Sequence, residues 1–334
     1  MAKVLLPDSE GIAQAAEIIR AGGLVAFPTE TVYGLGAHAL LALAVAKIFA
    51  AKGRPHFDPI IVHVADPKEA EELWAEVPSL ARRLIERFWP GPLTLVLPKR
   101  EKVPDIVTAG LPTVGVRMPA HPVALALIRE AGVPIAAPSA NRFGKLSPTH
   151  HEAVLEQLGE RIDAVIAGGP TPVGIESTVV SLVEDPPRVL RPGGTPIEAL
   201  REFLPNLRVE PPQGPSASPG TLPCHYRPAT PLFLLEPGPA EGGEALDRSR
   251  CGFLAFQRAW HGFAQVEILS EKGDLVEAAA RFFALLRKLD QAGLSAIVAE
   301  PVPEEGLGLA IMDRLRRASS GRARLDETKV WISR

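Results

Sequence analysis

The sequence is short of cysteine. Its 334 residues include two, Cys224 and Cys251, which lie far apart and form no CxxC pair and no Cys/His spacing of the kind that binds metals. A disulfide-rich secreted scaffold and a structural zinc site are therefore excluded, because both need more sulfur ligands at closer spacing. We expect both cysteines to be free thiols in a reducing compartment.

Net charge and long apolar runs are also scarce. With a formal charge of -3, the chain as a whole has no electrostatic reason to bind nucleic acid or an anionic membrane, although a local basic cleft stays open. No stretch of about 18 residues is apolar throughout, and the first ten residues contain no signal-peptide core. We therefore predict a cytoplasmic protein that does not contact a membrane.

Several signatures of known sites are missing as well. There is no GxxxxGK[ST] phosphate loop, no GxSxG elbow and no HExxH metal motif. The glycine-rich run at 306–311 lacks the third glycine of a dinucleotide fingerprint. His121, His150 and His151 stand beside proline or at a helix start, which favours capping or exposed positions over metal ligation.

What the chain does contain is a regular alternation of strand and helix patterns. Strands are expected where short apolar runs lie between breakers, and helices where apolar residues recur every three or four positions. In the first 205 residues, helices are expected at 9–20, 40–51, 79–88, 123–130 and 152–158, and strands at 24–26, 60–64, 93–97, 114–118, 135–137, 164–167 and 178–183. This alternation predicts an α/β domain with a twisted, mixed sheet.

A proline-rich stretch separates this domain from the rest of the chain. Residues 205–231 contain eight prolines and little apolar periodicity, which is typical of a stiff, extended linker. Beyond it, strands are expected at 232–235, 252–256, 266–269 and 296–299, and helices at 275–289 and 309–318. We therefore predict a first domain at 1–205, a linker at 206–231 and a second, smaller α/β domain at 232–334.

Four clusters of polar residues stand at expected strand ends or loops of the first domain. They are FPTETVYGLG at 27–36; Lys52 and Arg54, with Asp58 and His63 downstream; PSANRFGKLSPT at 138–149; and GIEST at 174–178, followed by Arg191. Ligands of open α/β sheets bind where strands end, so these clusters are candidate binding residues. Each also has a plain structural interpretation, as a capped turn or as cations at the end of a helix dipole. In the first cluster, Gly34 and Gly36 are expected to supply backbone freedom.

Taken together, the motifs resemble those of the YrdC/TsaC family of threonylcarbamoyl-AMP synthases. The similar segments are, in the family's order, FPTETVYGLG, KGRP followed by PIIVHV, PGPLTLVLP, VGVRMP, SANRFGKLSPT, GIESTVV and RPGG. They cover roughly residues 10–200, while CHYRP in the linker and GLGLAIMDRLRRAS near the end are similar to the longer, two-domain form. The resemblance implies a YrdC-like fold for the first domain and a Rossmann-like fold for the second.

The resemblance also implies an enzyme, a nucleotidyltransferase that makes threonylcarbamoyl-AMP and pyrophosphate from L-threonine, bicarbonate and ATP, with Mg²⁺ on the phosphates. A tRNA threonylcarbamoyl transferase would then modify the adenosine next to the tRNA anticodon. The inventory of residues agrees with this chemistry, because no covalent nucleophile is evident and the reaction needs mainly alignment and charge neutralisation. Direct binding of tRNA is left open.

Binding residues of the family are carried over onto the matching positions alone. Those implied for L-threonine are Thr31, His63, Arg117 and Ser177. Those implied for ATP are Lys52, Arg54, Asp58, Thr113, Ser139, Asn141, Ser147, Arg191 and Tyr226, and Lys52 and Arg54 are also given the catalytic role. Arg117 would pair with the substrate carboxylate, which suits the forked guanidinium. No metal bound by the protein itself is implied.

Some roles and two alternatives stay open. Asp58 stands where the family has asparagine, and a carboxylate repels triphosphate unless it faces Mg²⁺ or the ribose. Tyr226 lies in the linker, which suggests a lid that keeps water from the mixed anhydride. Thr29 and Glu30 are interpreted as shaping their loop, and Tyr33 has no assigned role. The alternatives are an RNA-binding module of the same fold and a hydrogenase-maturation carbamoyl-transfer domain, which would need zinc-finger cysteines.

Overall fold

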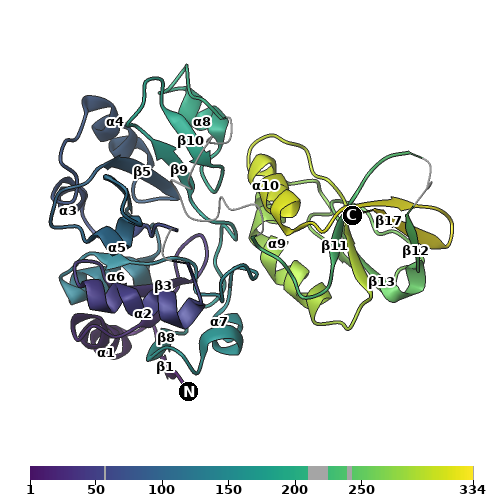
Figure 1. The fold of residues 1–334 in the computed structure, drawn as a ribbon, viewed down its shortest axis with the longest axis horizontal. Helices are drawn as coiled ribbons and strands as arrows, with labels where there is room; N and C mark the ends of the chain where they lie inside the picture. Colours follow the sequence, from purple (N-terminus) through teal and green to yellow (C-terminus); the bar gives the residue numbers. More distant parts are fainter. Residues whose placement is uncertain (56–57, 210–224, 239–242, 334) are drawn as a thin grey trace. The chain divides into compact units, whose positions relative to one another are not determined.

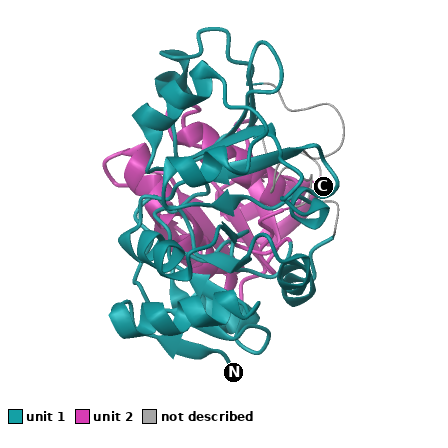
Figure 2. Cartoon of the chain, turned by 90° about the vertical axis from the view of Figure 1, so that its left-hand side faces the viewer, with its two compact units in different colours: residues 1–143, 147–222 teal, residues 144–146, 223–334 magenta. Residues whose placement is uncertain are grey.

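The chain forms two compact units in a computed structural model that describes residues 1–55, 58–209, 225–238 and 243–333. Unit 1 comprises residues 1–143 and 147–222, and unit 2 comprises residues 144–146 and 223–334 (Figure 2). Most of the proposed linker, 210–224, and with it Cys224, lies outside the described residues. The predicted domain boundaries therefore stay predictions.

Unit 1 is built on one ten-stranded mixed sheet in its described residues (Figure 1). Its strand order is β1-β8-β2-β3-β7-β4-β6-β5-β9-β10, with both parallel and antiparallel neighbours. The strands are β1 (Lys3–Leu5), β2 (Val25–Phe27), β3 (Gly34–His38), β4 (Val62–His63), β5 (Leu93–Pro98), β6 (Thr113–Arg117), β7 (Ile135–Ala136), β8 (Ala164–Ile166), β9 (Thr178–Ser181) and β10 (Arg188–Arg191).

Some helices of unit 1 have clear caps at one end. They are α1 (Ser9–Arg20), α2 (Ala42–Lys52), α3 (Pro67–Glu71), α4 (Ser79–Phe88), α5 (Asp105–Thr108), α6 (Pro122–Ala131), α7 (His151–Leu158) and α8 (Ile197–Arg201). The Asp8 side chain accepts a hydrogen bond from the Gly11 amide and so fixes the start of α1. Gly53 ends α2 with a φ of 64°, a left-handed conformation that favours glycine. This cap determines where Lys52 and Arg54 leave the helix.

A hydrophobic core holds α1 and α6 against β2, β7 and β8. Its buried side chains include Ile19 from α1, Leu127 from α6, Phe27 from β2 and Ile166 from β8. All four are 1% exposed or less, so the strand ends that carry polar groups project from a rigid base.

The first polar cluster is the turn of a hairpin, not an open loop at a strand end. Residues 34–38 form β3, which pairs antiparallel with β2 and places Gly36 opposite Val25. Neither Gly34 nor Gly36 has a positive φ, so the prediction that they supply backbone freedom is wrong. A Cβ atom at Gly36 would lie 2.7 Å from Phe27 Cε1 and 2.8 Å from Ile135 Cγ2. Glycine is needed there for close packing.

Unit 2 is a smaller α/β sheet with strand order β12-β17-β16-β11-β15-β13-β14 in its described part. The strands β16, β11, β15, β13 and β14 run parallel, and β12 and β17 add antiparallel pairs at one edge. The elements are β11 (Leu232–Leu235), β12 (Glu244–Asp247), η1 (Arg248–Arg250), β13 (Cys251–Ala255), β14 (Gln265–Ile268), α9 (Leu275–Asp290), β15 (Ala296–Ala299), α10 (Gly308–Ala318), β16 (Arg322–Leu325) and β17 (Lys329–Ser333).

The predicted fold class is confirmed: a mixed α/β first part and a smaller, Rossmann-like α/β second part. Asp274 caps α9 by accepting from the Val276 and Glu277 amides, and Phe282 and Leu286 bury one face of this helix. Cys251 is a free, buried cysteine. None of the helices in the described residues is long and apolar enough to cross a membrane.

Candidate functional site

The candidate site of unit 1 gathers residues from strands that are distant in sequence. β4 and β6 pair in parallel and place His63 opposite Arg117. β5 and β9 also pair in parallel, with Leu93 opposite Thr178. These two pairings bring residues from the second and fourth polar clusters into one sheet, which the sequence alone could not establish.

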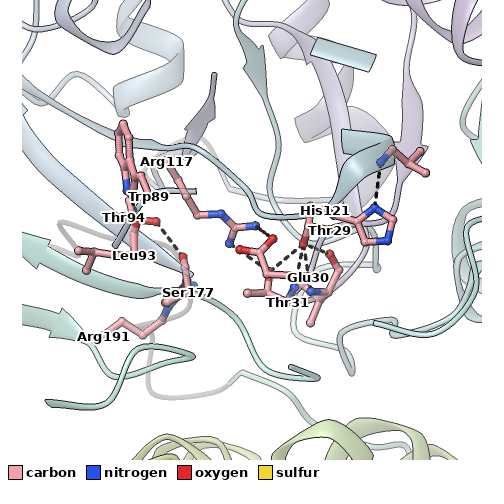
Figure 3. A network of polar contacts seen from close by, with 12 residues as sticks. Thr29, Glu30, Thr31, Trp89, Leu93, Thr94, Arg117, His121, Ser177 and Arg191 are labelled. Atoms are coloured by element: carbon pink, nitrogen blue, oxygen red, sulfur yellow. Dashed lines mark hydrogen bonds and ion pairs between the residues drawn. The ribbon is translucent and has the colours of Figure 1, made fainter. Parts of the chain in front are cut away.

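Arg117 connects the sheet to the hairpin turn (Figure 3). Its Nη1 donates to Thr31 Oγ1 at 3.1 Å, and its Nη2 lies 3.3 Å from Glu30 Oε2. The turn itself is held by Thr29, whose hydroxyl donates to the Val32 carbonyl at 2.6 Å and accepts from the Thr31 and Val32 amides. Thr29 therefore shapes the loop as predicted, whereas Glu30 and Thr31 face the arginine.

A second group of hydrogen bonds surrounds Ser177, just before β9. The Ser177 and Thr94 hydroxyls lie 2.8 Å apart. Arg191 donates through Nη2 to the Ser177 carbonyl at 2.9 Å and to its hydroxyl at 3.2 Å. Arg191 thus positions the Ser177 hydroxyl, which the family resemblance assigned to the L-threonine site.

Lys52 lies buried at the end of α2 and binds the loop after β7. Its Nζ donates to the carbonyls of Ser139 and Asn141, both at 2.5 Å. Burial, and then the nearby Arg54, hold the pKa of Lys52 well below its usual value, while Asp58 and Glu176 oppose that shift. The second and third polar clusters therefore meet, although Ser139 contributes its backbone rather than its hydroxyl to this contact.

Asp58 lies among three cations. Its Oδ2 is 2.9 Å from Arg54 Nη2, and its side chain is fully buried. Burial raises the pKa of Asp58, while the charges of Arg54, Lys52 and Arg191 act to lower it. A region where these three positive groups converge suits a polyanion such as a triphosphate.

The side chains of the remaining predicted ATP residues of unit 1 lie as follows. Ser147 is fully buried and donates to Glu176 Oε1 at 2.5 Å. Thr113 begins β6 and so stands four residues, about 13 Å, from Arg117 at the other end of that strand. Asn141 donates through its amide nitrogen to the Arg142 carbonyl at 2.8 Å.

Tyr226 belongs to unit 2, where it is 1% exposed. Its φ is 60°, a left-handed conformation unusual for a bulky residue. The Arg314 guanidinium lies 5.4 Å from the centre of its ring, and the Phe283 ring is 5.7 Å away. Tyr226 thus has packing partners within unit 2.

Matches to family models identify the chain. A Sua5/YciO/YrdC family model, described as telomere recombination, matches residues 17–193, and a model of the threonylcarbamoyl-AMP synthase C-terminal domain matches residues 195–320. A Pyrococcus abyssi protein named threonylcarbamoyl-AMP synthase is 47% identical over 319 residues, which are 92% of this chain and 94% of the relative. The chain belongs to the threonylcarbamoyl-AMP synthase family.

Other relatives agree with this assignment. A Bacillus subtilis threonylcarbamoyl-AMP synthase is 45% identical over 325 residues, covering 93% of each chain. The crystal structure of P. abyssi Sua5 complexed with L-threonine is 42% identical, with a TM-score of 0.87 over 96% of this chain and 97% of that one. Escherichia coli YciO matches 58% of this chain, with a TM-score of 0.51 and 27% identity. Their names do not favour the RNA-binding alternative.

Three polar residues of the candidate site were not assigned a binding role from the sequence. Glu30 and Glu176 lie within the motifs TET and IEST. The order of residues in a motif does not determine which side chains face inward. Thr94 is fully buried on β5. The available signal in the sequence was a hydroxyl-bearing residue within the otherwise apolar segment PLTLVL. Tyr33 gains a role as well: its hydroxyl donates to the Gly169 carbonyl at 2.8 Å and accepts from the Gly168 amide.

A resident metal centre has no obvious ligands. In the described ranges, no three His, Cys, Asp or Glu side chains gather in a way that could hold a metal ion.

Proposed function

We propose that this protein forms threonylcarbamoyl-AMP and pyrophosphate from L-threonine, bicarbonate and ATP. The observation that carries the proposal is the 45–47% identity, over more than nine-tenths of the chain, to proteins named for that activity. The buried cluster of cations and hydroxyls in unit 1 supports it, because adenylate formation depends on alignment of reactants and on charge neutralisation.

L-Threonine would occupy the region around Arg117. The guanidinium would pair with the α-carboxylate, and the hydroxyls of Thr31 and Ser177 are polar partners for the rest of the amino acid. His63 is 4% exposed, and burial, together with Arg117, holds its pKa well below the usual value. It would therefore act as a neutral hydrogen-bonding group rather than as a second cation.

ATP would take the region where Lys52, Arg54 and Arg191 converge. Lysine supplies a point charge and arginine a planar fork, and both suit phosphate oxygens. In this arrangement the carbamate oxygen attacks the α-phosphate and pyrophosphate leaves. Lys52 and Arg54 would stabilise negative charge on the leaving group, so we give them the catalytic role. Thr113, Ser139, Asn141 and Ser147 are proposed nucleotide contacts.

Asp58 fits a role toward Mg²⁺. Its Oδ1 is buried and has no hydrogen-bond partner among the residues that the structure describes, and carboxylate oxygen is a ligand that Mg²⁺ prefers. Mg²⁺ held there and by the phosphates would supply further charge neutralisation. In the absence of nucleotide, the ion pair with Arg54 compensates the negative charge of the carboxylate. This pairing explains how an aspartate can stand among cations that are proposed to bind phosphate.

Tyr226 is proposed to contribute to ATP binding, as the resemblance implies. Its fixed conformation in unit 2 supports a specific role for the side chain, since strain of this kind persists where the surroundings enforce it. Tyr226→Ala should weaken ATP binding or shorten the lifetime of the adenylate. Unchanged turnover and product lifetime would contradict that role. The downstream tRNA transferase and a cytoplasmic location stay predictions.

The proposed reaction can be tested by mixing the protein with ATP, Mg²⁺, bicarbonate and L-threonine and measuring pyrophosphate. Release should require both L-threonine and bicarbonate, and threonylcarbamoyl-AMP should form in equal amount. Release that is independent of either substrate would overturn the proposal.

A further inference from the structure

Glu30 is a buried acid that the proposed chemistry has not yet used. Its side chain is 7% exposed, and its Oε2 contacts Arg117 at 3.3 Å. The other carboxylate oxygen, Oε1, is buried and has no hydrogen-bond partner among the residues that the structure describes. Burying such an oxygen without a donor is costly, so an unsatisfied one in a binding site indicates a donor that arrives with a ligand.

Hydrogen bonds of the two flanking threonines hold the turn that carries Glu30. Its neighbours Thr29 and Thr31 share a hydrogen bond of 2.8 Å between their hydroxyls, and the Thr29 hydroxyl also accepts from the Val32 amide. Figure 3 shows the Glu30 carboxylate and the Arg117 guanidinium turned toward one another beside Thr31. The turn and the end of β6 therefore place a carboxylate and a guanidinium side by side.

The geometry of the contact with Arg117 differs from that of a strong carboxylate–guanidinium pair. One carboxylate oxygen meets one guanidinium nitrogen at 3.3 Å, whereas the strong form of this pair uses two short parallel hydrogen bonds. Arg117 Nε is likewise buried with no hydrogen-bond partner in the described part of the chain. Both side chains keep capacity for a ligand.

We propose that Glu30 accepts a hydrogen bond from the α-amine of the amino-acid substrate while Arg117 pairs with its α-carboxylate. This inference rests on the proposed function. Both groups are attached to the same carbon of an α-amino acid, so a carboxylate on Arg117 brings the amine to the side chain next to it. Adjacent opposite charges match the zwitterion.

The same contact can serve both the substrate and the carbamate. The ammonium group of the zwitterion first loses one proton to the solvent. The free amine then condenses with bicarbonate: one N–H hydrogen and the bicarbonate hydroxyl leave as water, and a C–N bond forms. The nitrogen retains one N–H. Glu30 can hold that N–H before and after the step, and so fixes the direction in which the new carbamate oxygen points.

The test compares two ligands on two proteins by calorimetric titration. The ligands are L-threonine and (3R)-3-hydroxybutanoate, which is L-threonine without its amine, and the proteins are the full chain and its Glu30→Gln variant. We expect the variant to bind L-threonine about tenfold to a hundredfold more weakly, because a charge-assisted hydrogen bond is lost. Its affinity for hydroxybutanoate should change by less than about threefold, since that ligand has no N–H to donate.

Two results would overturn the inference. An equal loss for both ligands would mean that Glu30 acts on Arg117 alone, and an unchanged affinity for L-threonine would mean that Glu30 does not touch the substrate. Failure of the unsubstituted protein to bind L-threonine would instead contradict the proposed function. If Glu30→Gln lowers the thermal midpoint, Glu30→Asp provides a second variant, which keeps the charge but shortens its reach and should show the same ligand dependence.

Discussion

The two units bury charged side chains in different ways. Among the described residues, the buried charged ones are Glu30, Lys52, Arg54, Asp58, Arg117, Glu176 and Arg191 in unit 1, and Glu267 and Arg314 in unit 2. Those of unit 2 have local partners: Glu267 pairs with Lys288 at 2.7 Å, and Arg314 with Asp313 at 3.2 Å. In unit 1 three cations converge on one acid. Because buried charge is costly unless compensated, the convergent charge of unit 1 fits the proposed ligand site, whereas the paired charge of unit 2 fits a structural role.

The strongest test of this difference is Lys52→Ala. Pyrophosphate release should fall by at least about a hundredfold, because the variant lacks the point charge proposed for the triphosphate. Lys47→Ala is the matched control on the same helix, since the Lys47 ammonium donates to the Gly22 carbonyl at 2.6 Å and has no proposed role in the reaction. Initial rates at saturating substrates measure both. Equal losses would show that α2 is merely sensitive to substitution.

The buried arginine of unit 2 should affect stability instead. Arg314→Met removes a fully buried guanidinium that contacts Asp313 and the Tyr226 ring, and we expect the free energy of unfolding to fall by about 1 to 3 kcal/mol. Arg316→Met is the control on the same helix, where an exposed pair with Glu304 should contribute less than about 1 kcal/mol. Denaturant titration measures both. If the two variants lose the same stability, Arg314 has no special structural role.

A smaller effect on substrate affinity is expected at Ser177. Ser177→Ala should raise the KM for L-threonine about tenfold, because the hydrogen bond proposed to the substrate and the contact with Thr94 disappear. Thr94→Val, which keeps the Ser177 hydroxyl, should raise it less than about threefold. Steady-state kinetics at varied L-threonine separate the two. A larger effect for Thr94→Val would mean that the substrate contacts Thr94 rather than Ser177.

Sequence patterns predicted the elements with strong periodicity and missed the weak ones. The helices α1 and α4 and the strands β11 and β15 have the expected bounds, because capping residues and apolar runs define them locally. The short strands β1 and β10, and the pair β16 and β17, were not expected. β1 and β16 mix charged with apolar residues, and pairing with distant strands defines them. β10 and β17 contain short apolar runs at 189–190 and 330–332, which were not interpreted as strands.

In the candidate site, too, the sequence predicted some features and missed others. The motifs indicated which polar clusters matter, but not that Lys52 would turn toward the backbone carbonyls of Ser139 and Asn141. Nor did they indicate that Glu30 would face Arg117, since both its neighbours hold the turn. Such contacts depend on strand order and side-chain direction, which arise from the whole sheet.

The subtlest expected difference between the units concerns pH. Burial, and secondarily Arg117, hold the pKa of His63 well below its usual value, so the native state leaves this ring neutral where the unfolded chain, with a pKa of about 6.5, binds a proton. Stability contributed in this way is present above about pH 6.5 and is lost as the pH falls below it. Denaturation midpoints at pH 7.5 and 5.5 should therefore differ more for the unsubstituted protein than for His63→Gln. His261→Gln, at an exposed position of unit 2, should keep the original difference. The same pH dependence in all three proteins would mean that the carboxylates, rather than this buried histidine, determine the acid sensitivity of unit 1.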